Sequence, residues 1–365
     1  MTDVSRASVW RSKRLWSLLW AFGLLALTLS LVFKERAQVA QALPLLWHAD
    51  LWILAVTASC EVVFFVLQAV AAFLLFRLYG KKTRVTALTA LLFIATMINE
   101  VLPTAGVSGT AGFIYWCERL GYGLRDSLAV NIWMTVLSYL ALVPVALVCV
   151  RAVILLPGVP GRLIANMLEL AVLFVGLIAL AIFLVYRIAK RMSHRQNTVA
   201  PPLDMENSTG IRYYVLQRLM RIWRRARAFT ASHTTRELSK EWRQARHHPV
   251  PLLLSTLLLA SIYAVRIIML RLCMHAIGND LSWSHALFVY CLTLMFSVVS
   301  LAPTTLGVVE LALTTTMSWF GVPLPAAVAG TVLYRLSSFW LPIPVGLLCQ
   351  WTLGKQVNWR AKSDS

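Results

Sequence analysis

Long apolar runs separated by short polar segments fill most of the 365-residue chain. A helix that spans a bilayer needs about 20 predominantly apolar residues. The runs of about this length or more are Leu15–Phe33, Leu51–Tyr79, Ser127–Val150, Leu163–Tyr186, Val250–Leu272 and Ala326–Leu353. The first exceeds the apolar core of an ordinary signal peptide, about 7–15 residues, so we expect an uncleaved helix there. The pattern predicts an all-α polytopic membrane protein with about six full spans.

Two further pairs of apolar runs are too short to span comfortably, and each pair is separated by helix breakers. They are Val85–Leu102 with Thr110–Leu120, around Pro103, Gly106 and Gly109, and Leu287–Leu301 with Leu311–Phe320, around Pro303 and Gly307. Irregular backbone at membrane depth is tolerated only where it is buried in protein or lines a cavity. We therefore predict two re-entrant helical hairpins with these residues at their tips.

The two breaker regions align with each other at a constant offset without gaps. The matching pairs are Pro103/Pro303, Thr104/Thr304, Gly121/Gly321, Leu124/Leu324, Ala129/Ala329, Ser138/Ser338, Pro144/Pro344, Val145/Val345, Leu147/Leu347 and Cys149/Cys349. The order of spans opens one hairpin to the inside and the other to the outside. The units, about 85–150 and 285–353, are thus predicted to form an inverted repeat, a common transporter design. The alternative is an old duplication that survives only as packing.

Composition supports a single integral membrane domain over residues 1–365, since 59% of residues are hydrophobic and 13% are charged. Soluble domains carry about 25% charged residues. The net charge of +19 could indicate a nucleic-acid partner, but we attribute it to the excess of basic residues in cytoplasmic segments. The predicted topology places most of the 34 lysines and arginines in the cytoplasm. Outside the cytoplasm it places only Lys34, Arg36, Arg151, Arg162 and Arg271. We therefore expect both termini in the cytoplasm and no nucleic-acid partner.

Residues 187–249 are polar and basic and are predicted to form a cytoplasmic loop. Within it, residues 211–229 have an amphipathic pattern, whose apolar stripe is Ile211, Val215, Leu219, Ile222, Ala226 and Phe229. Such a helix can lie on the inner leaflet and gather anionic lipids. Generic anchoring by positive charge is the alternative interpretation.

The sequence shows no enzyme signature. The cysteines Cys60, Cys117, Cys149, Cys273, Cys291 and Cys349 lie in or beside apolar runs and form no CxxC pair, which is typical of small apolar fillers. No P-loop and no G-x-S-x-G motif occurs. We predict no catalytic residue, no metal site and no cofactor.

Charged residues at membrane depth are the candidates for function, because each is costly unless it is paired or wet. Glu310 and Arg335 are predicted to pair and to contact or gate a substrate, although a purely structural pair is an equal alternative. Arg266 is a candidate for binding an anionic headgroup, or it snorkels to the outer surface. Glu61 and Glu169 are weaker candidates.

Polar residues beside the first tip add to this path. Asn99 and Glu100 precede Pro103 and are predicted to face the tip, or to hydrogen-bond its backbone, and Asn131 adds a buried amide. The first unit has Thr110 and Thr135 at the positions of Glu310 and Arg335. The two hairpins are therefore expected to have different roles.

Two motifs resemble the signatures of a known family. Asn99–Gly109 resembles its first signature in the form P-x-x-G-x-S-G, and Leu306–Glu310, Gly321–Pro323 and Leu333–Pro342 resemble its C-terminal signature. The family is that of the lysylphosphatidylglycerol synthase transmembrane, or flippase-like, proteins. The resemblance implies a multi-spanning protein of the bacterial inner membrane. In multiple-peptide-resistance proteins this domain moves aminoacylated phosphatidylglycerol between leaflets, and relatives are linked to hopanoid, glycolipid and polyprenyl pathways.

The chain also departs from the family pattern. It ends at Ser365 without an aminoacyl-transferase domain, so we expect it not to synthesise lysyl-lipid itself. Many members carry an acid and an arginine after the first glycine motif, where this chain has Thr110 and Phe113. Its substrate is therefore expected to differ from theirs.

The sequence thus predicts a lipid flippase-like transporter that moves or presents an amphipathic phospho- or glycolipid. Its expected partners are anionic or glycosylated membrane lipids and lipid-synthesis enzymes. The alternatives are a membrane-embedded enzyme or enzyme subunit of lipid or polyprenyl metabolism, and a proton-coupled carrier of small solutes that uses Glu100 or Glu310.

Overall fold

The computed structural model describes residues 36–102, 106–155, 176, 248–299 and 307–363. The chain divides into two compact units, Met1–Ala171 with Leu253–Ser365, and Val172–Leu252. The first unit holds nearly all of the described residues. Of the second, only Gly176 and residues 248–252 are described. The predicted amphipathic helix at 211–229 lies outside the described residues.

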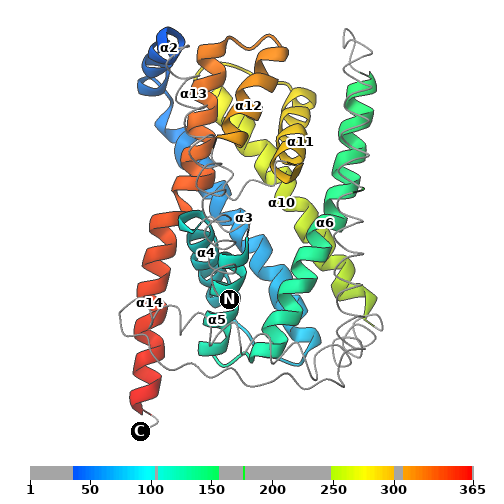
Figure 1. Cartoon of the computed structure of the whole chain (residues 1–365), viewed down its shortest axis with the longest axis vertical. Coiled ribbons are helices and arrows are strands. Elements are labelled where there is room, and N and C mark those ends of the chain that lie inside the picture. The colour runs from blue at the N-terminus through cyan, green and yellow to red at the C-terminus, as the bar shows by residue number, and fades with distance from the viewer. Residues whose placement is uncertain (1–35, 103–105, 156–175, 177–247, 300–306, 364–365) are drawn as a thin grey trace, which may run out of the picture. The chain divides into compact units, whose positions relative to one another are not determined.

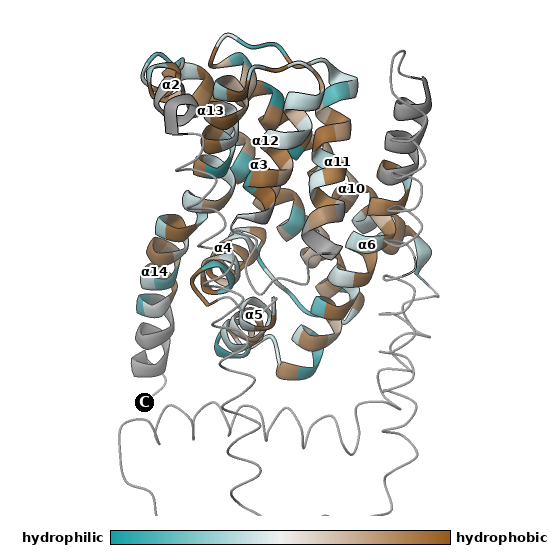
Figure 2. Cartoon of the chain, turned by 45° about the horizontal axis from the view of Figure 1, so that its top comes forward, coloured by the Kyte–Doolittle hydropathy of each residue, from teal (hydrophilic) through white to brown (hydrophobic). Residues whose placement is uncertain are grey.

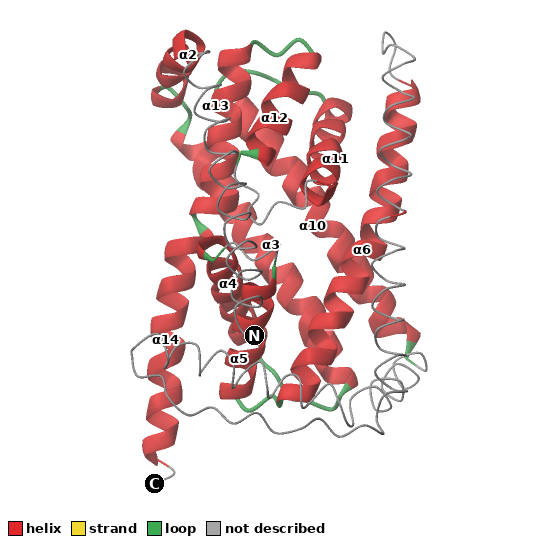
Figure 3. Cartoon of the chain, in the orientation of Figure 1, coloured by secondary structure: helices red, strands yellow, loops and turns green. Residues whose placement is uncertain are grey.

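The described part of the chain consists of helices joined by turns, without a strand (Figures 1 and 3). The helices are α2 (Arg36–Trp47), α3 (Leu51–Leu78), α4 (Val85–Val101), α5 (Val107–Arg119), α6 (Leu124–Leu155), α10 (Pro249–His275), α11 (Trp283–Val299), α12 (Val308–Trp319), α13 (Leu324–Arg335), the π-helix η1 (Leu336–Trp340) and α14 (Pro342–Ser363).

Four stretches of the described helices are long and apolar enough to cross a membrane. They are Leu51–Leu78, Leu124–Val145, Pro249–His275 and Leu324–Lys355, and apolar residues predominate along them (Figure 2). The protein is therefore a multi-pass membrane protein, as predicted. Of the other two predicted spans, Leu15–Phe33 lies outside the described residues, and so does Leu163–Tyr186 except for Gly176.

The helices beside the predicted tips are short. α4 and α11 have 17 residues each, and α12 has 12. At about 1.5 Å per residue these lengths fall below the hydrocarbon thickness of about 30 Å. α4 packs on α5, and α11 packs on α12. Residues 103–105 and 300–306, which include Pro103 and Pro303, lie outside the described residues, so the re-entrant hairpins stay a prediction.

Glycines with positive φ mark both ends of α5 and α12. Gly106 (φ 87°) and Gly307 (φ 85°) begin the two helices, and Gly121 (φ 84°) and Gly321 (φ 78°) follow their last turns. The terminal turns match in their bonds, since Gly121 N donates to Glu118 O and Gly321 N to Ser318 O, both at 3.0 Å. The initial glycines are one residue out of the gapless register, because one more residue separates Gly307 from Pro303 than separates Gly106 from Pro103. The inverted repeat stays a prediction.

Two elements differ from the sequence expectation. The segment around Pro44, to which the sequence analysis assigned no element, forms α2, which packs on α13 and buries Ala42. The run Ala326–Leu353 was expected to be one regular helix, but a π-turn interrupts it, with Leu341 N donating to Leu336 O at 2.9 Å. Pro342 cannot donate to the carbonyl of Ser338, and its ring would press on that carbonyl in a regular helix. The wider turn relieves this conflict.

Glycines on α5 and α14 allow the backbones of these two helices to pack closely against α4. A Cβ on Gly346 of α14 would lie 2.7 Å from Phe93 O and 2.6 Å from Met97 Cβ. A Cβ on Gly109 of α5 would lie 2.8 Å from Ala95 O. Since backbone atoms cannot move aside cheaply, both glycines are required by close packing, as in many membrane helix pairs. α4 is thus held between α5 and α14.

We expect Gly346→Val to destabilise the protein by about 1–3 kcal/mol, because the added side chain overpacks the contact between α14 and α4. The measurement is the thermal midpoint of the purified protein in detergent. Gly354→Ala on the same helix is the control, since its Cβ would meet Trp116 at an ordinary 3.9 Å. Equal midpoints for the two variants would contradict the assigned packing.

Candidate functional site

Glu310 and Arg335, the pair predicted from the sequence, are in contact. Arg335 Nε donates to Glu310 Oε1 at 2.6 Å, which joins the first turn of α12 to the end of α13. The second carboxylate oxygen, Oε2, accepts from Gly307 N at 2.7 Å. A carboxylate here is favourable, because the first amides of a helix lack partners and the helix dipole is positive at this end. The contact is established, while a role in transport stays a prediction.

Glu310 lies in the first turn of α12, since this helix begins directly after Gly307. The cause is local: Gly307 takes a positive φ, which allows the helix to begin there. The Glu310 carboxylate therefore both caps the start of α12 and binds Arg335.

Arg335 has unused hydrogen-bonding capacity. The residue is only 9% exposed, and its guanidinium lies over the Phe339 ring, 4.5 Å from the centroid. Nη2 is buried and has no hydrogen-bond partner among the described residues. An unsatisfied buried donor costs about 1–3 kcal/mol, more if it is charged. The Glu310 side chain is 32% exposed, so the pair is less enclosed on the carboxylate side.

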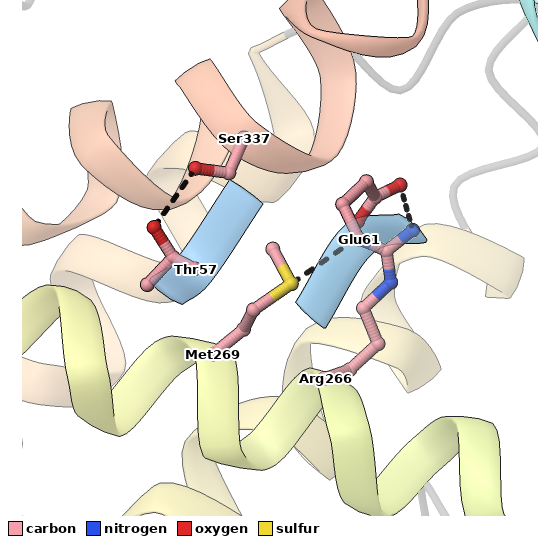
Figure 4. A network of polar contacts seen from close by, with 5 residues as sticks. All are labelled: Thr57, Glu61, Arg266, Met269 and Ser337. Atoms are coloured by element: carbon pink, nitrogen blue, oxygen red, sulfur yellow. Dashed lines mark hydrogen bonds and ion pairs between the residues drawn. The ribbon is translucent and has the colours of Figure 1, made fainter. Parts of the chain in front are cut away.

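A second ion pair joins α3 to α10 (Figure 4). Arg266 Nη1 donates to Glu61 Oε2 at 2.5 Å and Nη2 to Oε1 at 3.0 Å, while the guanidinium also lies 3.8 Å from the Phe64 ring centroid. The Glu61 side chain is fully buried. The two-pronged geometry uses the planar fork of arginine fully, so Arg266 is already engaged.

The sequence analysis missed Glu61 as the partner of Arg266. Both charges lie within apolar spans, and a lone charge at such a depth is costly. Their opposite signs were therefore a usable signal for pairing. Spacing could not supply it, because the two residues are far apart in the chain.

The π-turn lies next to this second pair. Ser337 of η1 and Thr57 of α3 are joined by their hydroxyl oxygens at 3.3 Å, and Thr57 precedes Glu61 by about one helical turn (Figure 4). Ser338 Oγ is buried without a partner among the described residues. A π-turn inside a helix frequently marks a functional site, and this one begins directly after Arg335.

Glu100, at the end of α4, lies within electrostatic reach of both pairs. Its carboxyl interacts with Arg335, Arg266 and Glu310. Glu61, Glu100, Arg266, Glu310 and Arg335 are called the polar cluster below. The described structure thus brings together five residues that the sequence analysis named, four of them for the substrate path and Glu61 as a weaker candidate.

Two buried tyrosines extend the surroundings of the cluster, and the sequence analysis did not find them. Tyr290 and Tyr334 both interact electrostatically with Arg266. A tyrosine in an apolar run generally needs a partner for its hydroxyl, which is the signal that was available. Their hydroxyls place further polar groups beside the arginine.

The first glycine motif has a structural explanation. Gly106 supplies the positive φ that begins α5, and Gly109 allows α5 to touch the α4 backbone. Between them, Ser108 Oγ donates to Leu102 O at 2.8 Å, which satisfies a carbonyl at the end of α4. Gly109 therefore lies in the first turn of α5, and its place at a hairpin tip stays a prediction. The motif fixes the α4–α5 pair.

The remaining polar candidates lie around or outside the cluster. Asn99 is half-buried on α4, and its Oδ1 is buried without a partner among the described residues. Asn131 is half-buried on α6, where its main-chain carbonyl accepts from Thr135 Oγ1 at 2.9 Å. Within the described ranges, no three His, Cys, Asp or Glu side chains gather as metal ligands would.

Breaking the Glu61–Arg266 pair should impair folding. We expect Glu61→Leu to destabilise the protein by about 3–5 kcal/mol, because it leaves Arg266 buried without its counter-charge. The double variant Glu61→Leu/Arg266→Met should recover most of this loss, since it removes both charges. Thermal midpoints in detergent measure both effects. A single variant as stable as the wild type would contradict the structural role.

Comparison with known proteins agrees with this architecture. No curated protein matches the chain. Residues 15–346 match the family described as the lysylphosphatidylglycerol synthase TM region, which is linked to membrane-lipid modification and translocation. The match includes the described members of the polar cluster and both glycine-bounded helices. The chain therefore belongs to the family of the lysylphosphatidylglycerol synthase transmembrane region.

Proposed function

We propose that this protein moves an amphipathic phospho- or glycolipid between the leaflets of the bacterial inner membrane, or presents it for movement. The observation that carries the proposal is Arg335, a buried guanidinium within an apolar span whose Nη2 has no hydrogen-bond partner among the described residues. Such a group suits an anionic oxygen of a lipid headgroup, because the fork of arginine matches phosphate and carboxylate. Family membership supports a lipid as the substrate.

The polar cluster is the proposed path of the headgroup. Its members come from α3, α4, α10, α12 and α13, and intramembrane charges that face a bundle interior mark substrate pathways. The headgroup would pass between the two predicted tips while the acyl chains stay in the bilayer. Asn99 and Glu100 would line this path on the side of α4.

The re-entrant hairpins and the inverted repeat are part of the proposal. The shortness of α4, α5, α11 and α12 and the matching turns at Gly121 and Gly321 support it. In transporters of this design, the substrate site lies near the midplane at interrupted helices. We place both termini in the cytoplasm, and we expect lipid-synthesis enzymes to supply or receive the lipid.

The two arginines have different roles in this proposal. Arg266 is held by both oxygens of Glu61, whereas Arg335 is held through Nε by a carboxylate that also caps α12. Of the two, only Arg335 therefore combines burial with a free donor among the described residues. We assign headgroup contact to Arg335 and positioning of α3 against α10 to Arg266.

Arg335→Lys should slow lipid translocation by about ten- to a hundredfold. Lysine keeps the charge but loses the fork, and a charge-assisted hydrogen bond of about 1.5–3 kcal/mol corresponds to that range of rates. The measurement follows fluorescent phosphatidylglycerol in proteoliposomes, with dithionite to quench the outer leaflet. Arg119→Lys, at an exposed position in the last turn of α5, is the control. Unchanged translocation by folded Arg335→Lys protein would overturn the assignment.

Glu310→Gln should fold yet translocate more slowly, by about tenfold or more. Glutamine keeps an oxygen that can accept from Gly307 N but removes the charge opposite Arg335, which changes how tightly the arginine is held. The same proteoliposome assay applies, with thermal midpoints to verify folding. Glu118→Gln, an exposed acid on α5, should behave as the wild type. Equal rates for Glu310→Gln and Glu118→Gln would limit Glu310 to a structural role.

A further inference from the structure

The polar cluster contains more acids than bases. Glu61, Glu100 and Glu310 face two arginines, Arg266 and Arg335. A guanidinium stays charged in proteins. Glu61 is matched by Arg266 and Glu310 by Arg335, so both bases are already used. One carboxyl of the cluster therefore has no counter-charge of its own among the described residues.

That carboxyl belongs to Glu100. It interacts with the arginines through space, and no hydrogen bond joins it to another described residue. Glu100 also lies in the last turn of α4, where the helix dipole is negative and unpaired carbonyls gather. Both features disfavour a carboxylate and favour a neutral carboxyl group. The position, half-buried and beside the first predicted tip, leaves room for exchange with water.

We propose that Glu100 carries a proton across the membrane in step with the lipid. The inference rests on the proposed function and adds its source of energy. The carboxylate takes a proton from water on one side and becomes a neutral carboxyl group. It returns that proton to water on the other side and becomes a carboxylate again. No other bond is made or broken, and the proton gradient drives the lipid.

The charged groups around Glu100 make it the suitable member of the cluster. α4 packs on α3, α5 and α14. Arg77, Glu118, Arg119 and Lys355 on those helices lie towards the beginning of α4, since α3 ends just before it and Gly354 of α14 reaches Trp116 of α5. That end is about 22 Å from Glu100 along the helix. The charges that interact with Glu100 are therefore Arg335, Arg266 and Glu310. On α3, Glu61 is bonded to Arg266.

A competition for Arg335 would couple the proton to the lipid. Arg335 Nη2 has no partner among the described residues, and Glu100 interacts electrostatically with Arg335, so a headgroup oxygen and the Glu100 carboxylate compete for the same positive charge. When Glu100 is protonated, it is a poorer acceptor, and the headgroup binds Arg335 more favourably. When the proton leaves, the carboxylate competes for the guanidinium and favours release. Proton and headgroup thus bind and leave together.

The test uses the full chain in vesicles of phosphatidylcholine and phosphatidylglycerol, with fluorescent phosphatidylglycerol as the probe. Internal pyranine reports proton movement, and valinomycin with potassium holds the membrane potential at zero. For one proton per lipid, a gradient of one pH unit should shift the steady-state leaflet ratio of the probe by up to about tenfold. Reversing the gradient should shift the ratio in the opposite direction.

Glu100→Gln should lose the gradient response, because glutamine cannot exchange a proton. Glu100→Asp keeps a carboxyl group and should retain the response, and Glu118→Gln is the matched control. A variant that fails to fold is recognised by its thermal midpoint in detergent, and Glu100→Asp then carries the test, since it must respond to the gradient if the carboxyl group is the carrier.

The outcomes separate the two proposals. Wild-type protein that moves no probe at any gradient overturns the proposed lipid translocation and this inference with it. Probe movement that reaches the same leaflet ratio at every gradient overturns proton coupling and leaves lipid translocation standing. A folded Glu100→Gln protein that responds like the wild type overturns the assignment to Glu100.

Discussion

A guanidinium inside a membrane protein must find an acceptor, and this requirement underlies the described structure. Arg266 and Arg335 lie within spans, where lipid offers no hydrogen bonds and water is scarce. Glu61 and Glu310, which lie on other helices, accept hydrogen bonds from Arg266 and Arg335 respectively. The two ion pairs thereby fix α3 against α10 and the start of α12 against the end of α13. Apolar side chains pack around the two ion pairs.

Close backbone packing brings Glu100 to the same place. Gly109 and Gly346 allow α5 and α14 to touch α4, and α4 ends beside the two ion pairs. The π-turn between α13 and α14 also affects how the helices around the cluster pack. It accommodates Pro342 while Ser337 stays in contact with Thr57 of α3. Small residues and one irregular turn therefore set the positions of the charges.

The two pairs are alike in chemistry but differ in how completely they are satisfied. Glu61 and Arg266 use their oxygens and nitrogens on each other, which is typical of a structural pair. Arg335 is buried, and its Nη2 has no hydrogen-bond partner in the part of the chain that the structure describes. Glu310 accepts both from Arg335 and from the amide of Gly307 at the start of α12. A pair that is incompletely satisfied at membrane depth is suited to exchange partners with a substrate. Because the chain belongs to a lipid-linked family, the substrate that we propose is a lipid headgroup.

The sequence by itself determined what depends on neighbouring residues. Apolar run length predicted the four spans that the structure describes, and Gly106 and Gly307 marked the breaks after which α5 and α12 begin. It also indicated the Glu310–Arg335 pair, whose members share one short region. Only the tertiary structure joined Glu61 to Arg266, brought Glu100 to both arginines and packed α2 on α13. Each of these depends on contacts between helices that are distant in the chain, and a periodic apolar pattern carries no information about which helices meet. The π-turn has a local cause in Pro342.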